Sequence, residues 1–237
     1  MIRGGGGTVI PDFGGPSSCV EANRAFCWDW VRDHWGDTLQ PALVQHVELS
    51  LIAVGIGFAI AFVLALAGYR FRLLDPPIGF VADFLYTIPS LALFQLLVPV
   101  TGLTVTTVEV ALVGYTLLIL YRNMLAGLRN VPVEALEAAR GMGMTRRQTF
   151  WRVELPLAVP AIVAGLRIAV VSTISIATIA AFVIPQGLGR PIFVALGQDL
   201  FKTEILAAGA LAIALALVAD GVLVLVQRVL TPWSRLA

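Results

Sequence analysis

The stretch from residue 49 to residue 69 reads LSLIAVGIGFAIAFVLALAGY and contains no charged residue. A helix needs about 20 consecutive, mainly apolar residues to cross a bilayer. The stretch therefore predicts a membrane-spanning helix. Two small residues within it, Gly55 and Gly57, would let a neighbouring helix approach its backbone closely.

The composition of the whole chain also indicates a membrane protein. Of its 237 residues, 58% are hydrophobic and 13% are charged, and the mean hydropathy is +0.88. A soluble domain usually carries about 25% charged residues, because its surface must face water. We therefore expect most of the surface of this protein to face lipid. The net charge of +1 gives no indication of a nucleic-acid partner.

Four more apolar stretches have the length of a membrane span. The predicted spans are 49–69, 78–100, 104–125, 157–184 and 205–230. Pro99 and Gly102 separate the second from the third, because the combined stretch is too long for one crossing. In the fourth, Ala161 and Gly165 have the spacing of a close-packing helix face. The sequence therefore predicts an all-α, polytopic membrane protein with about five transmembrane helices.

The arginines predict the orientation of these spans. They gather after the first span, around the loop between the third and fourth, and at the end of the fifth: Arg70, Arg72, Arg122, Arg129, Arg140, Arg146, Arg147, Arg152, Arg228 and Arg235. Short loops rich in Lys and Arg remain in the cytoplasm. We therefore expect a multi-pass protein of the cell membrane, with its N-terminus outside and its C-terminus in the cytoplasm.

Residues 1–45 form a separate extracytoplasmic segment in this interpretation. Met1–Gly15 is rich in glycine and is expected to be disordered. Further on, four residues recur at helical spacing and predict one apolar helix face: Trp28, Val31, Trp35 and Leu39. Such a helix could lie on the outer leaflet or pack on the outer ends of the spans, and the pattern does not separate these alternatives.

Cys19 and Cys27 both lie in this outer segment, where thiols can oxidise. A disulfide between them is one of two open possibilities, the other being two free thiols. We expect no metal site, because two cysteines without nearby partners make a poor ligand set.

The most polar internal stretch is Arg129–Pro156, RNVPVEALEAARGMGMTRRQTFWRVELP. Pro132 suits the first turn of a helix, and the glycines at 141 and 143 suit its end. The stretch therefore predicts a short helix over Val133–Arg140.

A second helix is predicted directly after the first. Thr145 can cap its N-terminus, and Pro156 is expected to end it as the chain enters the fourth span. On the first helix, Ala135, Ala138 and Ala139 are small, so another protein could approach the backbone closely. An ordinary cytoplasmic loop of mixed charge is the alternative.

The same stretch resembles the EAA motif of importer permeases in the ABC transporter superfamily. The motif is Glu-Ala-Ala, three residues, Gly, nine residues, an aliphatic residue, any residue and Leu-Pro. The matching positions are Glu137, Ala138, Ala139, Gly143, Val153, Leu155 and Pro156. The resemblance implies that this loop docks a separate ATPase subunit, with support from Arg140, Gly141, Arg146 and Arg147. A bulky residue at position 143 is expected to uncouple transport while the protein still inserts.

Residues 46–233 resemble the permeases of osmoprotectant importers, through YTIPSLALFQLLVP, EAARGMGMTRRQTFWRVELPLAVPAIVAGLR and LAAGALAIALALVADGVLVLVQRVLTP. The resemblance implies a type I, MetI-like permease fold and uptake of glycine betaine, choline, carnitine or proline betaine. It also implies a second permease subunit, either identical or related, an external substrate-binding protein and ATPase subunits. The chain departs from the family at residues 184–189, where it reads IPQGLG in place of the common GAGGLG.

No GxxxxGK[ST] phosphate loop occurs in the chain, so ATP and Mg²⁺ are expected on the partner ATPase. We therefore expect a transport subunit without enzymatic activity or a cofactor of its own. The alternatives are a permease for methionine, phosphonate or an organosulfur compound, an integral membrane enzyme, and a structural membrane protein. The enzyme would need a reactive constellation, and both histidines precede the first span.

Charged residues within spans are expected to be functional or paired, because burying a charge is costly. Arg167 is predicted to pair with Asp83 or Asp220 in a buried network. A quaternary ammonium solute is best held by aromatic faces. The candidate rings along the pathway are Tyr86, Phe94, Tyr115 and Tyr121.

Overall fold

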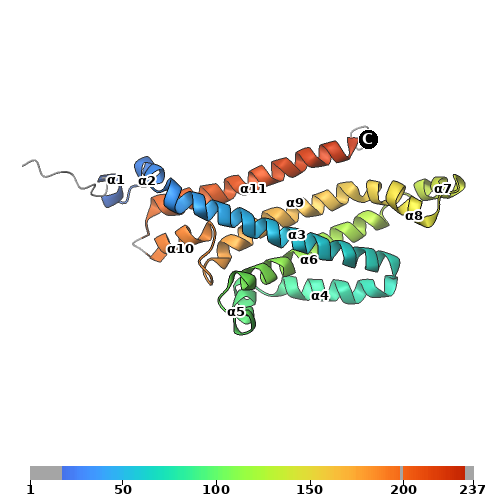
Figure 1. Ribbon diagram of the computed structural model, residues 1–237, viewed down its shortest axis with the longest axis horizontal. Coiled ribbons are helices and arrows are strands. Elements are labelled where there is room, and N and C mark those ends of the chain that lie inside the picture. Colours follow the sequence, from blue (N-terminus) through green and yellow to red (C-terminus); the bar gives the residue numbers. More distant parts are fainter. Residues whose placement is uncertain (1–17, 198–199, 233–237) are drawn as a thin grey trace, which may run out of the picture.

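The computed structural model describes residues 18–197 and 200–232, and Met1–Gly15 lies outside this part. Within the described residues the secondary structure is helical and contains no strand, so the all-α prediction is confirmed. The long helices run side by side in an elongated bundle (Figure 1). One end carries α7 and α8 and the other carries α2 and α10, and these are called the α7 end and the α10 end.

The main helices of the bundle are α3 (Gln40–Arg70), α4 (Asp75–Thr87), α5 (Ser90–Thr101), α6 (Val105–Arg129), α9 (Leu155–Ala180) and α11 (Lys202–Leu230). The shorter segments are α1 (Ser18–Glu21), α2 (Trp28–Asp33), η1 (Trp35–Leu39), η2 (Arg72–Leu74), α7 (Val133–Gly141), α8 (Arg146–Thr149), η3 (Phe150–Glu154) and α10 (Gly189–Gly197).

Four of the continuous helices in the described part are long and apolar enough to cross a membrane. A fifth crossing would be the broken pair of α4 and α5, which bends by 101°. The span predicted over 78–100 is therefore not one continuous helix but a pair of helices broken at residues 88 and 89. Pro89 disfavours helical geometry at the preceding residue, and Ile88 is extended there with ψ of 127°. Tyr115 donates its hydroxyl hydrogen to the Ile88 carbonyl, which satisfies an acceptor that the break exposes.

Helix α3, which contains the first predicted span, begins at residue 40, before residue 49 where that span was predicted to start, and its additional turns carry a buried histidine. The Leu188 N–H donates to His46 Nδ1 at 3.1 Å, so Nε2 carries the ring proton and donates to the Ile174 carbonyl at 3.0 Å. The His46 side chain therefore connects α3, α9 and the 184–189 loop at the α10 end. The uncharged stretch 49–69 gave no indication of this role, because His46 lies before the stretch begins.

The core is organised around α6, which packs against both α3 and α9. Glycine makes this close approach possible. A Cβ atom added at Gly57 of α3 would lie 1.9 Å from Thr116 Oγ1, and one added at Gly165 of α9 would lie 2.4 Å from Asn123 Cβ. Gly55, two residues from Gly57, has open space around it. Only one of the two small residues in that span therefore contacts a neighbouring helix.

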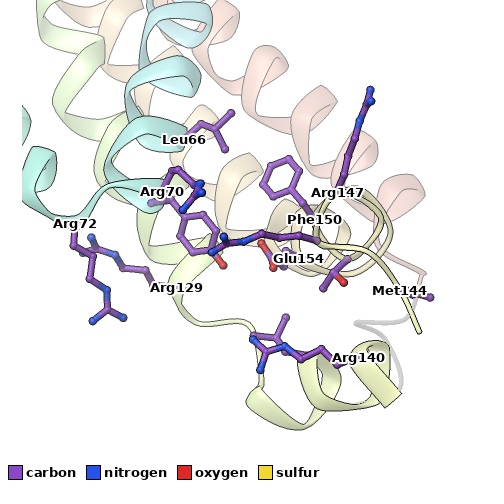
Figure 2. A pocket seen from close by; sticks show the side chains of 13 residues that line it. Leu66, Arg70, Arg72, Arg129, Arg140, Met144, Arg147, Phe150 and Glu154 are labelled. Carbon is purple, nitrogen blue, oxygen red and sulfur yellow. The ribbon is translucent and has the colours of Figure 1, made fainter. Parts of the chain in front are cut away.

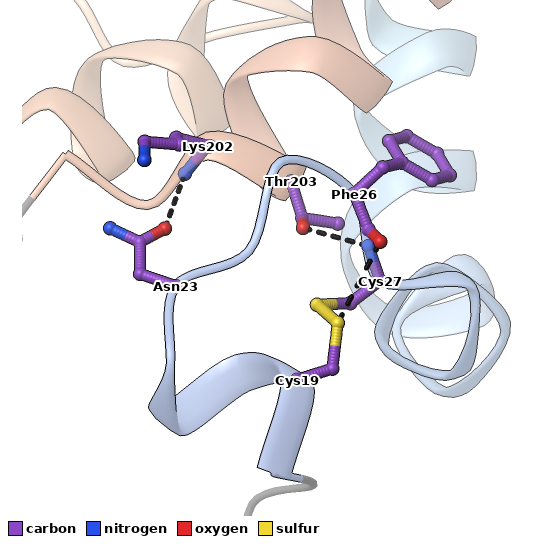
Figure 3. Close-up of a disulfide and its surroundings, with 6 residues drawn as sticks. All are labelled: Cys19, Asn23, Phe26, Cys27, Lys202 and Thr203. Carbon is purple, nitrogen blue, oxygen red and sulfur yellow. Dashed lines mark hydrogen bonds between the residues drawn. A yellow bond between two sulfur atoms is a disulfide. The ribbon is translucent and has the colours of Figure 1, made fainter.

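A disulfide joins Cys19 and Cys27 and closes the loop that precedes α2 (Figure 3). Two hydrogen bonds connect this loop to the start of α11. The Cys27 N–H donates to Thr203 Oγ1 at 3.0 Å, and the Lys202 N–H donates to Asn23 Oδ1 at 3.1 Å. The disulfide-closed loop is thus attached to the N-terminal turn of the last span.

The single apolar helix face predicted over residues 28–39 is wrong. The α-helical path stops at His34, with φ of −102° and ψ of 13°, and the chain continues as the π-helical segment η1. Leu39 is fully buried and, with Val31, packs on α11, whereas Trp28 is 71% exposed. This arrangement supports packing on the ends of the spans, because the burial of Leu39 comes from contact with α11.

Substitution of Gly165 by alanine should lower the thermal stability of the membrane protein. The added methyl group meets Asn123 Cβ, which cannot rotate away, so α6 and α9 must separate. Overpacking of this kind costs about 1–3 kcal/mol. The matched control is Gly55→Ala, where the methyl group meets open space and alanine favours the helix by about 0.5–1 kcal/mol. Equal melting temperatures for the two variants in the same detergent would contradict the close α6–α9 contact.

Candidate functional site

Helix α7 ends in a backbone motif that depends on glycine. Gly143 has φ of +75°, a left-handed conformation that residues with a Cβ atom rarely adopt. Its N–H donates to the Arg140 carbonyl at 2.9 Å, and the Met144 N–H donates to the Ala139 carbonyl at 3.1 Å. These two bonds make a Schellman motif, which turns the chain sharply out of α7. The helix predicted over Val133–Arg140 is therefore confirmed, within one residue at its end.

Thr145 caps the second helix as predicted. Its Oγ1 accepts from the Gln148 N–H, and Gln148 Oε1 accepts from the Thr145 N–H at 2.8 Å, which is a complete capping box. The prediction that Pro156 ends this helix is wrong, because the helix continues from Arg146 to Ala180. The π-helical turn η3 allows this. The Leu155 N–H bonds the Phe150 carbonyl five residues back, so the wider turn takes up the proline.

The residues of α7 divide into distinct faces. Ala139 is fully buried, and Leu136 and Arg140 line a cavity on the membrane side of the loop. Glu137 and Ala138 are exposed on another side of the helix, as is Glu134 one turn earlier. We call Glu134, Glu137 and Ala138 the docking face. Because the Schellman motif and the capping box fix both ends of the turn, the orientation of this face is determined by α9.

The C-terminal residues of the EAA-like motif lie on the bundle rather than on α7. Val153, Leu155 and Pro156 are partly buried at the junction of η3 and α9. Leu155 packs against the buried cluster that contains residues of α3, α6 and α9. These residues therefore position the loop on the bundle, whereas Glu137 and Ala138 offer a surface. Arg146 and Arg147 are exposed and line the same cavity as Arg140. Figure 2 shows Arg140 and Arg147 at this cavity.

Charges within the spans form two separate ion pairs. Arg167 of α9 binds Asp220 of α11 through two bonds, Nε–Oδ1 at 2.7 Å and Nη2–Oδ2 at 2.9 Å. This is one of the two predicted pairings. Asp83 pairs instead with Arg122 of α6, with 2.7 Å between Oδ2 and Nη2. The prediction of a buried network is wrong for this subunit, because the Arg167 and Asp220 side chains are about one third exposed, at 34% and 33%.

The four candidate aromatic rings lie in two environments. Phe94 and Tyr121 have no exposed surface and pack within the cores. Tyr86 and Tyr115 are in edge contact, with 5.9 Å between ring centroids, and Tyr86 remains 43% exposed. Only Tyr86 therefore has a substantially free ring in this conformation.

Sequence reasoning missed Asp75 of α4, which binds two residues of α6 at the α7 end. Its Oδ1 accepts from the Tyr121 hydroxyl at 2.8 Å, and its Oδ2 pairs with Arg129 Nη1 at 2.7 Å. Arg129 Nη2 also donates to the Gly68 carbonyl at 3.3 Å. The available signal was the run Asp75-Pro76-Pro77, which is typical of a helix start but does not identify the partners.

Replacement of Asp220 by asparagine should destabilise the bundle, because it leaves the Arg167 charge without its partner inside a span. Asparagine cannot neutralise the Arg167 guanidinium, so the thermal stability should fall, and the partial exposure of both side chains limits the size of the loss. The exchange Arg167→Asp with Asp220→Arg should recover part of the lost thermal stability. A double variant no more stable than the single one would contradict the direct pairing.

Comparison with known proteins places this arrangement in a family. The model for the binding-protein-dependent transport system inner membrane component matches residues 53–235. The choline transport system permease protein OpuBB of Bacillus subtilis (strain 168) is 37% identical over 189 residues, which cover 79% of this chain and 86% of that protein. The glycine betaine/carnitine/choline transport system permease protein OpuCB of the same strain is 37% identical over 190 residues, with the same coverage of 79% and 86%.

A solved structure shows the same fold. It is described as inward facing conformations of the MetNI methionine ABC transporter and gives a TM-score of 0.69 at 18% identity, over 86% of this chain and 97% of that one. The expected type I, MetI-like permease fold is therefore confirmed. This chain belongs to the family of inner membrane components of binding-protein-dependent transport systems.

Proposed function

We propose that this chain is the permease subunit of an ATP-driven importer that brings a quaternary ammonium compatible solute into the cell. The observation that carries the proposal is the exposed docking face on α7, held rigidly by the Schellman motif at Gly143 and by the continuous helix from Arg146 to Ala180. If a partner protein moves a membrane span by binding a surface of this chain, that surface must be fixed rigidly to the span. Here the docking face is fixed to α9.

The docking face would receive a separate ATPase subunit, which binds ATP and Mg²⁺ and closes on a second copy of itself. Ala138 allows close approach to the helix backbone, while Glu134 and Glu137 offer charge at its edge. Because α7 and α9 are joined without a flexible linker, closure would rotate α9 as a rigid body and switch access to the pathway.

This assignment places the α7 end in the cytoplasm and the α10 end outside. Arginines at the ends of α3 and α6 and on α7 and α8 lie at the α7 end, which supports this orientation. The disulfide at the α10 end also supports it, since disulfides persist in oxidising compartments. A substrate-binding protein would then deliver solute at the α10 end.

A second permease subunit would complete the pathway. The Arg167–Asp220 pair lies within two spans and remains about one third exposed on this subunit. Charges facing hydrocarbon are costly, so this side of the bundle fits a protein partner or an aqueous pathway better than lipid. Either a second copy of the chain or a related permease would meet that need.

The proposed cargo rests on relatives whose names include choline, glycine betaine and carnitine. All three molecules carry a trimethylammonium group, which binds aromatic faces through cation–π attraction of roughly 0.5–2 kcal/mol per ring. The half-exposed Tyr86 ring, beside Tyr115 at the α4–α5 break, is the candidate contact.

Uptake competition tests the cargo. With the ATPase and binding protein present in proteoliposomes, excess choline, glycine betaine or carnitine should reduce uptake of a labelled member of this group. Methionine and phosphonates should not compete, because they lack the quaternary ammonium group. Transport of methionine, a phosphonate or an organosulfur compound, with indifference to betaines, would support the alternative cargo and reject this one.

Substitution of Gly143 by alanine should weaken coupling without preventing insertion. The left-handed conformation costs alanine about 1–2 kcal/mol, so the turn that orients the docking face is strained. We expect reduced co-purification of the ATPase subunit and reduced uptake. Gly141→Ala is the matched control, because position 141 has open space and no positive φ. If the two variants retain the ATPase equally, the proposed role of the turn is incorrect.

A further inference from the structure

A cavity of roughly 970 Å³ opens at the α7 end, between the last turns of α3 and α6 and the α7–η3 loop. Arginines from separate elements surround this space (Figure 2). They are Arg70, Arg72, Arg129, Arg140, Arg146 and Arg147. Among the described residues that line the cavity, Glu154 is the one acidic residue. The cavity is therefore strongly cationic.

Most of this charge is not neutralised within the subunit. Arg129 pairs with Asp75 at 2.7 Å, whereas the other five arginines make no ion pair among the described residues. Membrane topology explains why arginines lie at this end of the bundle. It does not explain why side chains from α3, η2, α6, α7 and α8 converge on one cavity, because orientation requires only that they lie on the same side.

The cavity also has an apolar wall. Leu66 of α3, Leu136 of α7 and Phe150 of η3 line it beside the arginines. Leu66 lies one turn before the end of α3. The lining therefore extends from the end of that helix into the loop over residues 129–156, here called the coupling loop. An occupant that combines an anionic group with apolar surface would match both parts of the lining.

We propose that this cavity binds a phosphate-bearing anion, namely the headgroup of an anionic phospholipid in the adjoining leaflet. The guanidinium group presents a planar fork of donors that fits phosphate oxygens, and basic pockets between membrane helices bind such headgroups. The site is distinct from the docking face, since Leu136 and Arg140 lie on the opposite side of α7 from Ala138. A bound phosphate bridges α3 and α7 and thereby holds the coupling loop against the bundle.

The test compares lipid retention by two variants with equal charge loss. The complete complex, with its ATPase subunits, is reconstituted in nanodiscs of phosphatidylcholine containing phosphatidylglycerol. Phosphatidylglycerol retained after detergent exchange is then counted by native mass spectrometry. The test variant is Arg70→Gln with Arg72→Gln, which removes two cavity arginines outside the docking loop. The control is Arg152→Gln with Arg190→Gln, since neither residue lines this cavity.

The unmodified complex and the control should retain phosphatidylglycerol in preference to phosphatidylcholine. In the test variant, affinity should fall by about thirtyfold, as expected for two arginine contacts near a membrane surface. Thermal unfolding of each complex verifies that the variants are folded. A second arm titrates inorganic phosphate into complexes in phosphatidylcholine alone.

If phosphatidylglycerol retention depends on Arg70 and Arg72, the proposal is supported and the bound phosphate belongs to a lipid headgroup. Phosphate binding with the same dependence, but without lipid retention, supports the anion site with a soluble source and rejects the lipid. Equal retention by the test and control variants in both arms would overturn the proposal. None of these outcomes depends on the cargo, so failure here leaves the proposed transport function untouched.

Discussion

The close approach of α6 to α3 and α9 is the constraint on which the rest of the structure depends. Gly57 admits Thr116, and Gly165 admits Asn123, at distances that no side chain with a Cβ atom would allow. A similar contact occurs where Gly127 lies against α9. Helices in lipid gain no hydrophobic energy from association, so packing at small residues is a principal source of their attraction. The bundle then places the ends of α3, α6 and α9 together.

That convergence gives the coupling loop its rigidity. Asp75 connects α4 to α6 through Tyr121 and Arg129, and Arg129 reaches the end of α3. The loop leaves α6 next to this cluster and returns as a helix continuous with α9. The docking face on one side of α7 and the cationic cavity on the other are thus two sides of the same fixed element. An anion in the cavity and a partner on the docking face would act on the same helix.

Much of the architecture could be predicted from local pattern. Long apolar runs with few charged residues predicted the four continuous spans of the described part, because a helix in lipid requires an apolar composition along most of its length. The glycines at 141 and 143 and the cap at Thr145 predicted the loop, since left-handed and capping positions strongly select their residues. Pattern failed at the α4–α5 break and at Pro156. Each of these places contains a proline. At Pro89 the chain breaks into two helices that meet at 101°, whereas at Pro156 the helix continues because the π-helical turn η3 accommodates the proline ring.

The sequence by itself determined the membrane class, the helical content and the position of the coupling loop, because each depends on neighbouring residues alone. Only the tertiary structure decided which charges pair: Arg167 with Asp220, and Asp83 with Arg122. It also decided that Phe94 and Tyr121 are buried, and that six arginines from five elements line one cavity. These are relations between helices, and helix rotation and register are set by contacts that are distant in the chain.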